Sequence, residues 1–385
     1  MNGIDRERLL TEFERLVSID AESYHEAEMK EYLRRRLTAL GLCVTEDGAA
    51  EALRSRGATA GNLYARLPGD LPGEARLFSA HMDTVSPGRG KRAVRQADGT
   101  IRSDGTTVLG ADDAAGLVSI LEALTVIRER GLSHPDIELL LTVAEEPYSQ
   151  GSAVADYSCV RAKTAYVLDL AGRVGTAALR APSLLSVSVC VRGRGAHAGF
   201  APEQGVNALT VTARALARLE TGRVSEDTTV NFGTIAGGTG PNVVPAEIRL
   251  CGEVRSLRHD EAQARGRLIA AVFREEAEKL GAAAEVTVTE QLRAYAVDPG
   301  EPVVRLFRRA AEETGCEPVL VTTFGGSDNN HFARHGLRGI VLACGMNEVH
   351  AVHEYTEADE LCRSAELTLR LMTMEALPGD GEPAD

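Results

Sequence analysis

The chain has 385 residues, which is too long for one ordinary hydrophobic core, so two domains are expected. Hydrophobic residues make up 44% of it and charged residues 25%, as in globular proteins, and the net charge of −14 argues against nucleic acid as a partner. No apolar run approaches the roughly 18 residues that span a bilayer, so no membrane partner is expected either.

The cysteine pattern indicates a reducing compartment. The seven cysteines are scattered and never form a C-x-x-C pair, which argues against a disulfide framework and against sulfur-ligated zinc. The amino-terminal stretch is charged and lacks the apolar core of a signal peptide. We therefore expect a cytoplasmic protein in which carboxylates and imidazoles hold any metal.

The first predicted strands lead to a His-x-Asp motif. Apolar periodicity predicts two helices and two strands, at 4–17, 25–40, 61–67 and 76–80. The second strand ends in His81-Met-Asp83. Residues i and i+2 of an extended chain point the same way, so both side chains can face one point. That pair suits a divalent metal, although a turn-capping Asp explains the tripeptide equally well by itself.

An aspartate pair begins the next helix. After a predicted polar loop over 87–107, Asp112 and Asp113 precede a long apolar stretch. Acidic residues at a helix start cap free N–H groups and interact favourably with the helix dipole. One Asp suffices for capping, so the second carboxylate of the pair is available for another role.

Two further apolar strands end in acid. The strand from 137 closes on Glu145-Glu146, and the strand at 164–169 closes on Asp169. Neighbouring carboxylates repel unless a cation lies between them, and the alternative is a solvated acidic loop. Strands that alternate with helices predict an α/β sheet, and ligands of such sheets bind outside the carboxyl ends of the strands. The convergence of several such strand ends at one edge of the sheet indicates a ligand site more strongly than any single motif does.

The pattern changes at about 182. Alternating strands and two helices follow in the order strand-helix-strand-strand-helix-strand, which is ferredoxin-like. We therefore predict the first part of a metal-binding domain (1–181), an inserted α+β domain (182–294) and the second part of the metal-binding domain (295–385). Its tail, 377–385, is expected to be disordered.

Two histidines stand in informative places. His197 lies among small residues, where the backbone can approach a ligand closely. His350 follows an apolar strand, where the other candidates also lie. A lone histidine is more often a surface residue or a core residue whose hydrogen bonds are satisfied. The position of His350 after an apolar strand favours a role at the site instead.

Taken in order, these motifs resemble those of the co-catalytic di-zinc metallopeptidases, which include aminopeptidase T (tripeptidase), carboxypeptidase G and the aminoacylases. The phrases S-A-H-M-D-T-V, L-G-A-D-D-x-A-G and G-G-S-D are most similar to the peptidase T-like branch, and the resemblance spans about residues 5–370. It implies a zinc-peptidase-type mixed sheet flanked by helices, with a ferredoxin-like lid that forms a homodimer. It also implies two divalent ions, Zn²⁺ with Co²⁺ or Mn²⁺ as alternatives.

The resemblance implies a set of metal ligands. Asp112 would bridge the two ions. His81 with Glu146 or Asp169 would complete one site, and His350 with the remaining carboxylate would complete the other. The peptide bond after Asp112 would be cis.

It also implies other roles at the site. Glu145 would be the general base, and Asp83 would orient the metal-binding histidine of its own motif. His197 of the lid would reach the active site of the partner subunit and steady the oxyanion. Asn242 and Arg255 would bind the backbone and the carboxylate of the substrate.

The expected activity is hydrolysis of peptide bonds in short peptides, as an aminopeptidase of tripeptidase type. One alternative is an amidohydrolase of N-acyl or N-carbamoyl amino acids, and another is a non-catalytic family member, which would have broken ligand motifs. Two departures from the family pattern are Ala114, where a Lys is usual, and Pro147 after the glutamate pair. The first alters local charge, and the second bears on substrate preference more than on chemistry.

Overall fold

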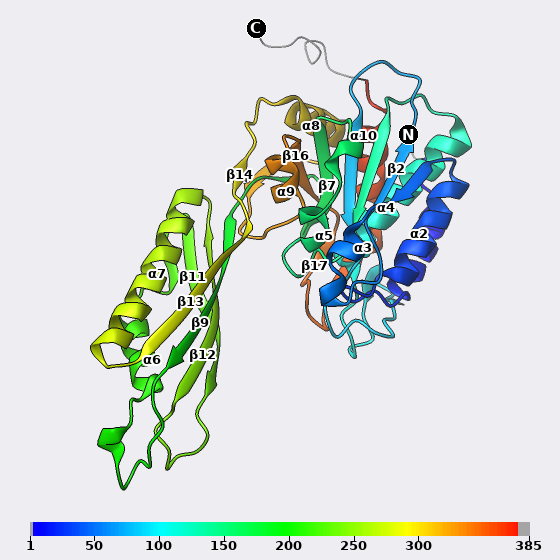
Figure 1. Ribbon diagram of the computed structural model, residues 1–385. Coiled ribbons are helices and arrows are strands. Elements are labelled where there is room, and N and C mark those ends of the chain that lie inside the picture. Colours follow the sequence, from blue (N-terminus) through cyan, green and yellow to red (C-terminus); the bar gives the residue numbers. More distant parts are fainter. Residues whose placement is uncertain (1–2, 376–385) are drawn as a thin grey trace. The chain divides into compact units, whose positions relative to one another are not determined.

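The computed structural model describes residues 3–375 and divides into two compact units (Figure 1). The α/β unit comprises Met1–Leu179, Ala296–Thr323 and Ser327–Asp385, and the inserted unit comprises Arg180–Tyr295 with Phe324–Gly326. The tail at 377–385 lies outside the described residues. Within 3–375, no helix is both long and apolar enough to cross a membrane.

Within residues 3–375, the α/β unit contains a nine-stranded mixed sheet in the order β1-β2-β6-β3-β7-β16-β8-β14, with β15 paired to β8. Its strands are β1 (Cys43–Glu46), β2 (Leu63–Leu67), β3 (Arg76–His81), β6 (Ile137–Thr142), β7 (Thr164–Leu170), β8 (Thr176–Ala181), β14 (Tyr295–Ala296), β15 (Val319–Thr322) and β16 (Arg338–Ala343). The central strands β6, β3, β7 and β16 run parallel, whereas β1, β2 and β8 pair antiparallel. The carboxyl ends of the parallel strands therefore meet at one edge.

Helices cover both faces of this sheet (Figure 1). They are α1 (Arg6–Val17), α2 (Ala27–Ala39), α3 (Ala49–Ala52), α4 (Ala111–Arg130), α5 (Gln150–Ala153), α8 (Pro302–Glu313), α9 (Asn329–Arg334) and α10 (Ala358–Thr373), with 3-10 turns at Arg54–Arg56 and Tyr157–Cys159. Helix α4 is buried from Ala111 to Ile127 because it packs against α1, α10 and the sheet. β3 and β6 are buried along their whole length, as parallel strands covered on both faces are.

The predicted polar loop at 87–107 is partly a sheet. It contains β4 (Val94–Arg95) and β5 (Thr100–Arg102), which join β17 (Met346–Asn347) and β18 (Tyr355–Glu357) in a four-stranded sheet of the described chain. The prediction was wrong here because these strands are short and mostly polar, and because β5 pairs with a strand more than 250 residues away. This small sheet anchors the loop that carries His350.

The inserted unit has, within the described residues, a five-stranded antiparallel sheet in the order β10-β11-β12-β9-β13. The strands are β9 (Ser183–Arg192), β10 (Gly222–Ser225), β11 (Thr228–Gly237), β12 (Glu247–Ser256) and β13 (Ala283–Leu292), with helices α6 (Ala208–Ala217) and α7 (His259–Lys279) and a 3-10 turn at Pro202–Gln204. Alternate residues of β9, from Leu185 to Val191, join the core formed with both helices. The order β11-β12-β9-β13 is ferredoxin-like, as predicted.

Candidate metal centre

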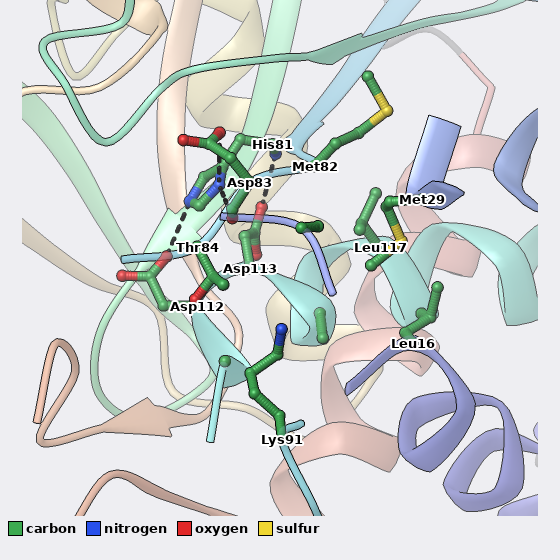
Figure 2. A pocket seen from close by; sticks show the side chains of 13 residues that line it. Leu16, Met29, His81, Met82, Asp83, Thr84, Lys91, Asp112, Asp113 and Leu117 are labelled. Atoms are coloured by element: carbon green, nitrogen blue, oxygen red, sulfur yellow. Dashed lines mark hydrogen bonds and ion pairs between the residues drawn. The ribbon is translucent and has the colours of Figure 1, made fainter. Parts of the chain in front are cut away.

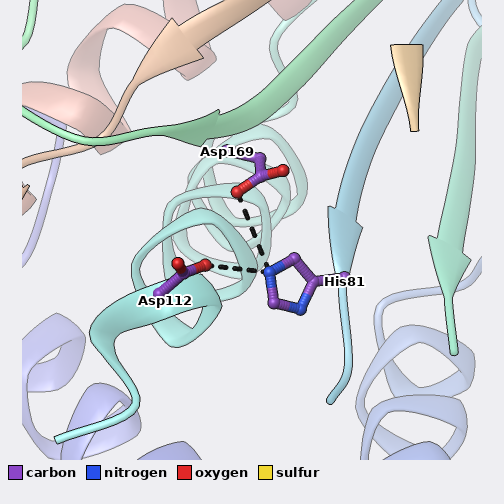
Figure 3. Close-up of side chains that lie close together, drawn as sticks. All are labelled: His81, Asp112 and Asp169. Atoms are coloured by element: carbon purple, nitrogen blue, oxygen red, sulfur yellow. Dashed lines mark hydrogen bonds and ion pairs between the residues drawn. The ribbon is translucent and has the colours of Figure 1, made fainter. Parts of the chain in front are cut away.

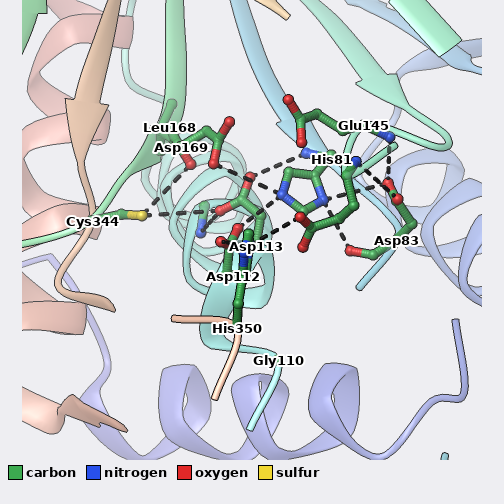
Figure 4. A network of polar contacts seen from close by, with 12 residues as sticks. His81, Asp83, Gly110, Asp112, Asp113, Glu145, Leu168, Asp169, Cys344 and His350 are labelled. Carbon is green, nitrogen blue, oxygen red and sulfur yellow. Dashed lines mark hydrogen bonds and ion pairs between the residues drawn. The ribbon is translucent and has the colours of Figure 1, made fainter. Parts of the chain in front are cut away.

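The strand ends bring the predicted site residues together (Figure 4). His81 is the last residue of β3, Asp169 lies near the end of β7, and Glu145 follows β6. Asp112 lies in the first turn of α4, which begins at the same edge of the sheet. Parallel strands therefore bring an imidazole and several carboxylates together at one edge of the sheet, although the chain separates them widely.

The first cluster consists of His81, Asp112 and Asp169 (Figure 3). His81 Nε2 lies 2.8 Å from Asp112 Oδ1 and 3.8 Å from Asp169 Oδ1. His81 Nδ1 lies 2.9 Å from the carbonyl oxygen of Asp83. A carbonyl can only accept, so Nδ1 carries the proton, and in the neutral ring Nε2 presents its lone pair to the carboxylates. A cation among these atoms satisfies all three groups.

The second cluster consists of Asp112, Glu146 and His350. His350 Nε2 lies 3.2 Å from Asp112 Oδ2 and 2.9 Å from Glu146 Oε2. Asp112 therefore turns one carboxylate oxygen toward each imidazole. The other oxygen of Glu146, Oε1, is buried without a hydrogen-bond partner among the described residues. The sequence left open whether Asp169 or Glu146 lies with His81, and in the structure Asp169 does.

The local charges favour a bound cation. Burial raises the pKa of Asp169 well above its usual value, and the nearby Glu145 carboxylate adds to the rise. Hydrogen bonds to Asp112 and Glu146 raise the pKa of His350 to about 10. In each cluster the ligand atoms lie within 4.8 Å of one another. Imidazole and carboxylate donors at this spacing fit divalent ions such as zinc, cobalt or manganese.

Asp83 holds the backbone of the glutamate pair. Its Oδ1 accepts from Glu145 N at 2.8 Å, and its Oδ2 accepts from Glu146 N at 3.2 Å and from Ser23 Oγ at 2.7 Å. Its carboxylate also lies 3.5 Å from His81 Nδ1, farther than its own carbonyl. Asp83 thus contacts both the histidine of the first cluster and a carboxylate-bearing residue of the second.

Glu145 lies on a tightly held turn. Its Oε1 accepts from Ser149 Oγ at 2.8 Å, and the side chain is buried. Ala144 and Ser149 have positive φ angles of 48° and 51°, conformations that persist in non-glycine residues where surrounding contacts fix them. The buried Glu26 supplies one such contact, since its Oε1 accepts from Ala144 N at 3.0 Å.

Sequence reasoning missed Glu26 and Ser149. Glu26 sits at the start of a charged helix and is not distinguished there from a solvent-exposed side chain. A signal for Ser149 was available, because a hydroxyl four residues after a candidate base can reach its carboxylate. Pro147, one of the two departures from the family pattern, lies inside this turn.

Asp113 is a cap rather than a member of either cluster. Its Oδ2 accepts from His81 N at 3.1 Å and its Oδ1 from Gly116 N at 3.0 Å, and the bond between Asp112 and Asp113 is cis, as the resemblance implied. Ala114 lines a small cavity of about 10 Å³ into which Lys91 extends (Figure 2). Burial lowers the pKa of Lys91 to about 8.

The remaining predicted residues belong to the inserted unit. His197 is exposed, and its Nδ1 accepts from Gly199 N and Phe200 N, both at 3.1 Å, so Nε2 carries the ring proton. Asn242 is exposed and its carbonyl accepts from Ala198 N at 2.9 Å.

Arg255 is already engaged within the inserted unit. Its Nε bonds Glu253 Oε1 at 2.7 Å and its Nη1 bonds the carbonyl of Phe324 at 2.8 Å. Carboxylate binding by this guanidinium would therefore compete with Glu253. The substrate-binding role of Arg255 stays a prediction.

Comparisons with known proteins show the family of the chain. Residues 181–280 match the peptidase dimerisation domain, and residues 62–187 match peptidase family M28. The chain is 37% identical to the uncharacterised protein YqjE of Bacillus subtilis, over 96% of this chain and 98% of that protein. The crystal structure of aminopeptidase PepT from Bacillus cereus is 39% identical, with a TM-score of 0.88 over 97% of this chain and 99% of the other.

A tripeptidase from Staphylococcus aureus is 33% identical, with a TM-score of 0.92 over 96% of this chain and 98% of its own. Both structures match nearly the full length of the chain, so the likeness covers the α/β unit and the insertion alike. The chain belongs to the peptidase T-like branch of the dinuclear metallopeptidases, and it is a metallopeptidase that hydrolyses peptide bonds.

Proposed function

We propose that this metallopeptidase is a cytoplasmic aminopeptidase that releases the first residue of tripeptides and similar short peptides, and that it works as a homodimer with two zinc ions. The observation that carries the proposal is the buried Asp112, whose two carboxylate oxygens each face one imidazole. The names of the Bacillus cereus and Staphylococcus aureus relatives supply the substrate class. N-acyl amino acid hydrolysis is not favoured.

The proposed ligands divide into two sets that share Asp112. His81 and Asp169 would hold one ion, and Glu146 and His350 the other. When bound, the two cations supply Lewis acidity, which acidifies a water molecule and polarises the scissile carbonyl. The hydrogen bond from His81 Nδ1 to the Asp83 carbonyl keeps the ring in the tautomer that a ligand needs.

Glu145 is the proposed general base. Because Ser149 Oγ bonds Oε1, the other oxygen is left to take the proton of the attacking water and to return it to the leaving amine. The hydrogen bond from Glu145 N to Asp83 Oδ1 fixes the backbone from which the Glu145 side chain extends. Accurate placement matters because proton transfer requires hydrogen-bond distance to the reacting atom.

His197 is the proposed oxyanion donor, and it would act on the active site of the partner subunit. Two backbone amides occupy its Nδ1, so Nε2–H faces outward as a donor. A well-placed donor to the developing oxyanion is worth about 3–4 kcal/mol. Asn242 and Arg255 would bind the backbone and the carboxylate of the peptide, the latter at the expense of the Glu253 pair.

A substrate screen tests the proposal. Metal-stripped protein is reconstituted with Zn²⁺, Co²⁺ or Mn²⁺ and assayed on Ala-Ala-Ala, on Ala-Ala and on N-acetyl and N-carbamoyl amino acids. We expect release of free alanine from the tripeptide, with blocked compounds left intact. Cleavage of the blocked compounds alone would contradict the proposal. Light scattering that finds an active monomer would contradict the dimer.

A further inference from the structure

We propose that Glu354 is a positioning residue for the two-ion site, which fixes the backbone of Asp112 and ties it to the loop that carries His350. The inference rests on the proposed function for its kinetic readout and on metal binding alone for its main test. Glu354 has no role in the motifs described above, and it is not one of the proposed metal ligands.

The start of α4 is capped only in part by its own side chains, since Asp113 accepts from Gly116 N but not from the amides before it. Its N-cap residue is Gly110, with φ of 72°, and no side chain there bonds a free amide. Asp112 and Asp113 have non-helical angles, with ψ of 99° and 38°. The first amides of this helix therefore need acceptors from elsewhere in the chain.

Glu354 supplies these acceptors from the far end of the sequence. Its Oε2 accepts from Gly110 N at 2.8 Å, and its Oε1 accepts from Asp112 N at 3.0 Å. The side chain is 1% exposed. A carboxylate is costly to bury unless it is hydrogen-bonded, and two backbone amides on its two oxygens meet that requirement with a fixed geometry.

The same residue closes the loop that carries His350. Glu354 N donates to the carbonyl of Ala351 at 3.0 Å, directly after His350. His350 and Glu348 have positive φ angles of 63° and 52°, which non-glycine residues keep where contacts hold them. The loop lies between β17 and β18, and β18 pairs with β5.

These contacts all bear on the distance between His350 and Asp112. His350 Nε2 lies 3.2 Å from Asp112 Oδ2, and the two residues come from segments 238 positions apart. Glu354 contacts the backbone of one and closes the turn after the other. Loss of the bonds to Glu354 therefore loosens the second cluster from both sides, whereas His81 and Asp169 are held by β3 and β7.

The test is a metal titration of Glu354→Gln. The glutamine keeps the size of the side chain but turns an NH₂ group toward one of the two amides, so one bond is lost. Metal-stripped protein is titrated with Co²⁺ by calorimetry, and the absorption spectrum is followed in parallel. We expect the weaker of the two ions to bind about 10–100-fold less tightly, as loss of an outer-shell partner does. The tighter ion shares Asp112 but is also held by His81 and Asp169, so we expect it to weaken by a smaller factor.

Glu360→Gln is the matched control. Glu360 is also buried, and its Oε2 accepts from Val174 N at 2.7 Å, but it bonds no residue of either cluster. We expect this variant to bind both ions with wild-type affinity. Equal weakening in the two variants would show a general loss of stability and would overturn the proposal, as would wild-type affinity of Glu354→Gln for both ions.

Two further readouts keep the test decisive. Excess metal should restore kcat of Glu354→Gln on Ala-Ala-Ala while KM stays near the wild-type value. If the glutamine variant does not fold, Glu354→Asp keeps the charge and withdraws it by one methylene, and wild-type affinity for both ions there would overturn the proposal. A wild-type protein that binds two ions and cleaves no peptide would refute the proposed function alone.

Discussion

The two clusters that share Asp112 differ in their surroundings. The His81 side chain is 1% exposed and the Asp169 side chain 11%, whereas the His350 side chain is 51% exposed. His81 and Asp169 lie on strands in the middle of the nine-stranded sheet, and His350 lies on a loop. Similar metal-binding groups thus lie in two settings. In the first cluster they lie on enclosed strands, and in the second the histidine lies on a loop that is open to water.

From this difference in exposure we expect the position of the ligands, on central strands or on a loop, to decide how strongly each ion would be held. Charges attract more strongly where water is excluded, and a buried charge left without its partner is destabilising. We therefore expect an enclosed ion that exchanges slowly and an open ion that exchanges readily. Because the His350 side chain is half exposed, we also expect a substrate to approach at the open ion.

The largest expected effect comes from Glu145→Gln, which tests whether both clusters serve one reaction. Removal of the general base should lower kcat on Ala-Ala-Ala by about 10²–10⁴-fold. Both ions should still bind, because Glu145 belongs to neither cluster, and metal analysis of the purified variant checks this. Turnover at the wild-type rate would show that another group takes the proton.

A direct test of the comparison sets His81→Ala against His350→Ala. In urea unfolding with chelator present, His81→Ala should lose about 3–5 kcal/mol, since it leaves buried carboxylates without a partner. His350→Ala removes a half-exposed pair and should lose about 0–1 kcal/mol. Equal losses would break the distinction between an enclosed and an open cluster.

Much of this site could be predicted from the sequence, because strand ends leave a pattern. His81, Glu145 and Asp169 each close an apolar run, and Asp112 opens an apolar helix. The fold class followed from the same alternation, and it is confirmed. The periodicity of apolar residues indicates on which face of a strand or helix a side chain lies. That information was sufficient for the side chains of the two clusters.

Supporting contacts could not be predicted in the same way. Glu354 bonds amides 242 and 244 residues away, and Glu26 bonds an amide 118 residues away. Backbone amides are present at every residue except proline, so nothing in the sequence marks which of them a carboxylate will meet. The strand at 100–102 was missed for a similar reason, since its partner at 355–357 is distant, and the strand at 94–95 that pairs with it is only two residues long.

His197→Ala should have the next largest effect, a fall in kcat of about 10²–10³-fold with both clusters intact. Mixing this variant with Glu145→Gln separates action within one subunit from action between two. One site of the mixed dimer then has an intact base and an intact histidine from different chains, so part of the activity returns. Mixtures that stay inactive would contradict the role in the partner subunit.

The smallest expected effect comes from Asp83→Asn, which should act on both clusters to a similar extent. Asp83 accepts from the amides of Glu145 and Glu146, and its backbone carbonyl holds His81. An asparagine turns an NH₂ group toward one of those amides, so it shifts Glu146 of the open cluster and changes the charge beside the enclosed one.

We expect Asp83→Asn to weaken both ions, each by about 10-fold, the lower end of what outer-shell partners contribute. Glu354→Gln, by contrast, should weaken the open ion much more than the enclosed one, which it reaches only through the shared Asp112. Titrating both variants with Co²⁺ under the same conditions separates a residue that supports the whole centre from one that supports half of it. If Asp83→Asn weakened only one ion, the carboxylate of Asp83 would support one cluster and not the whole centre.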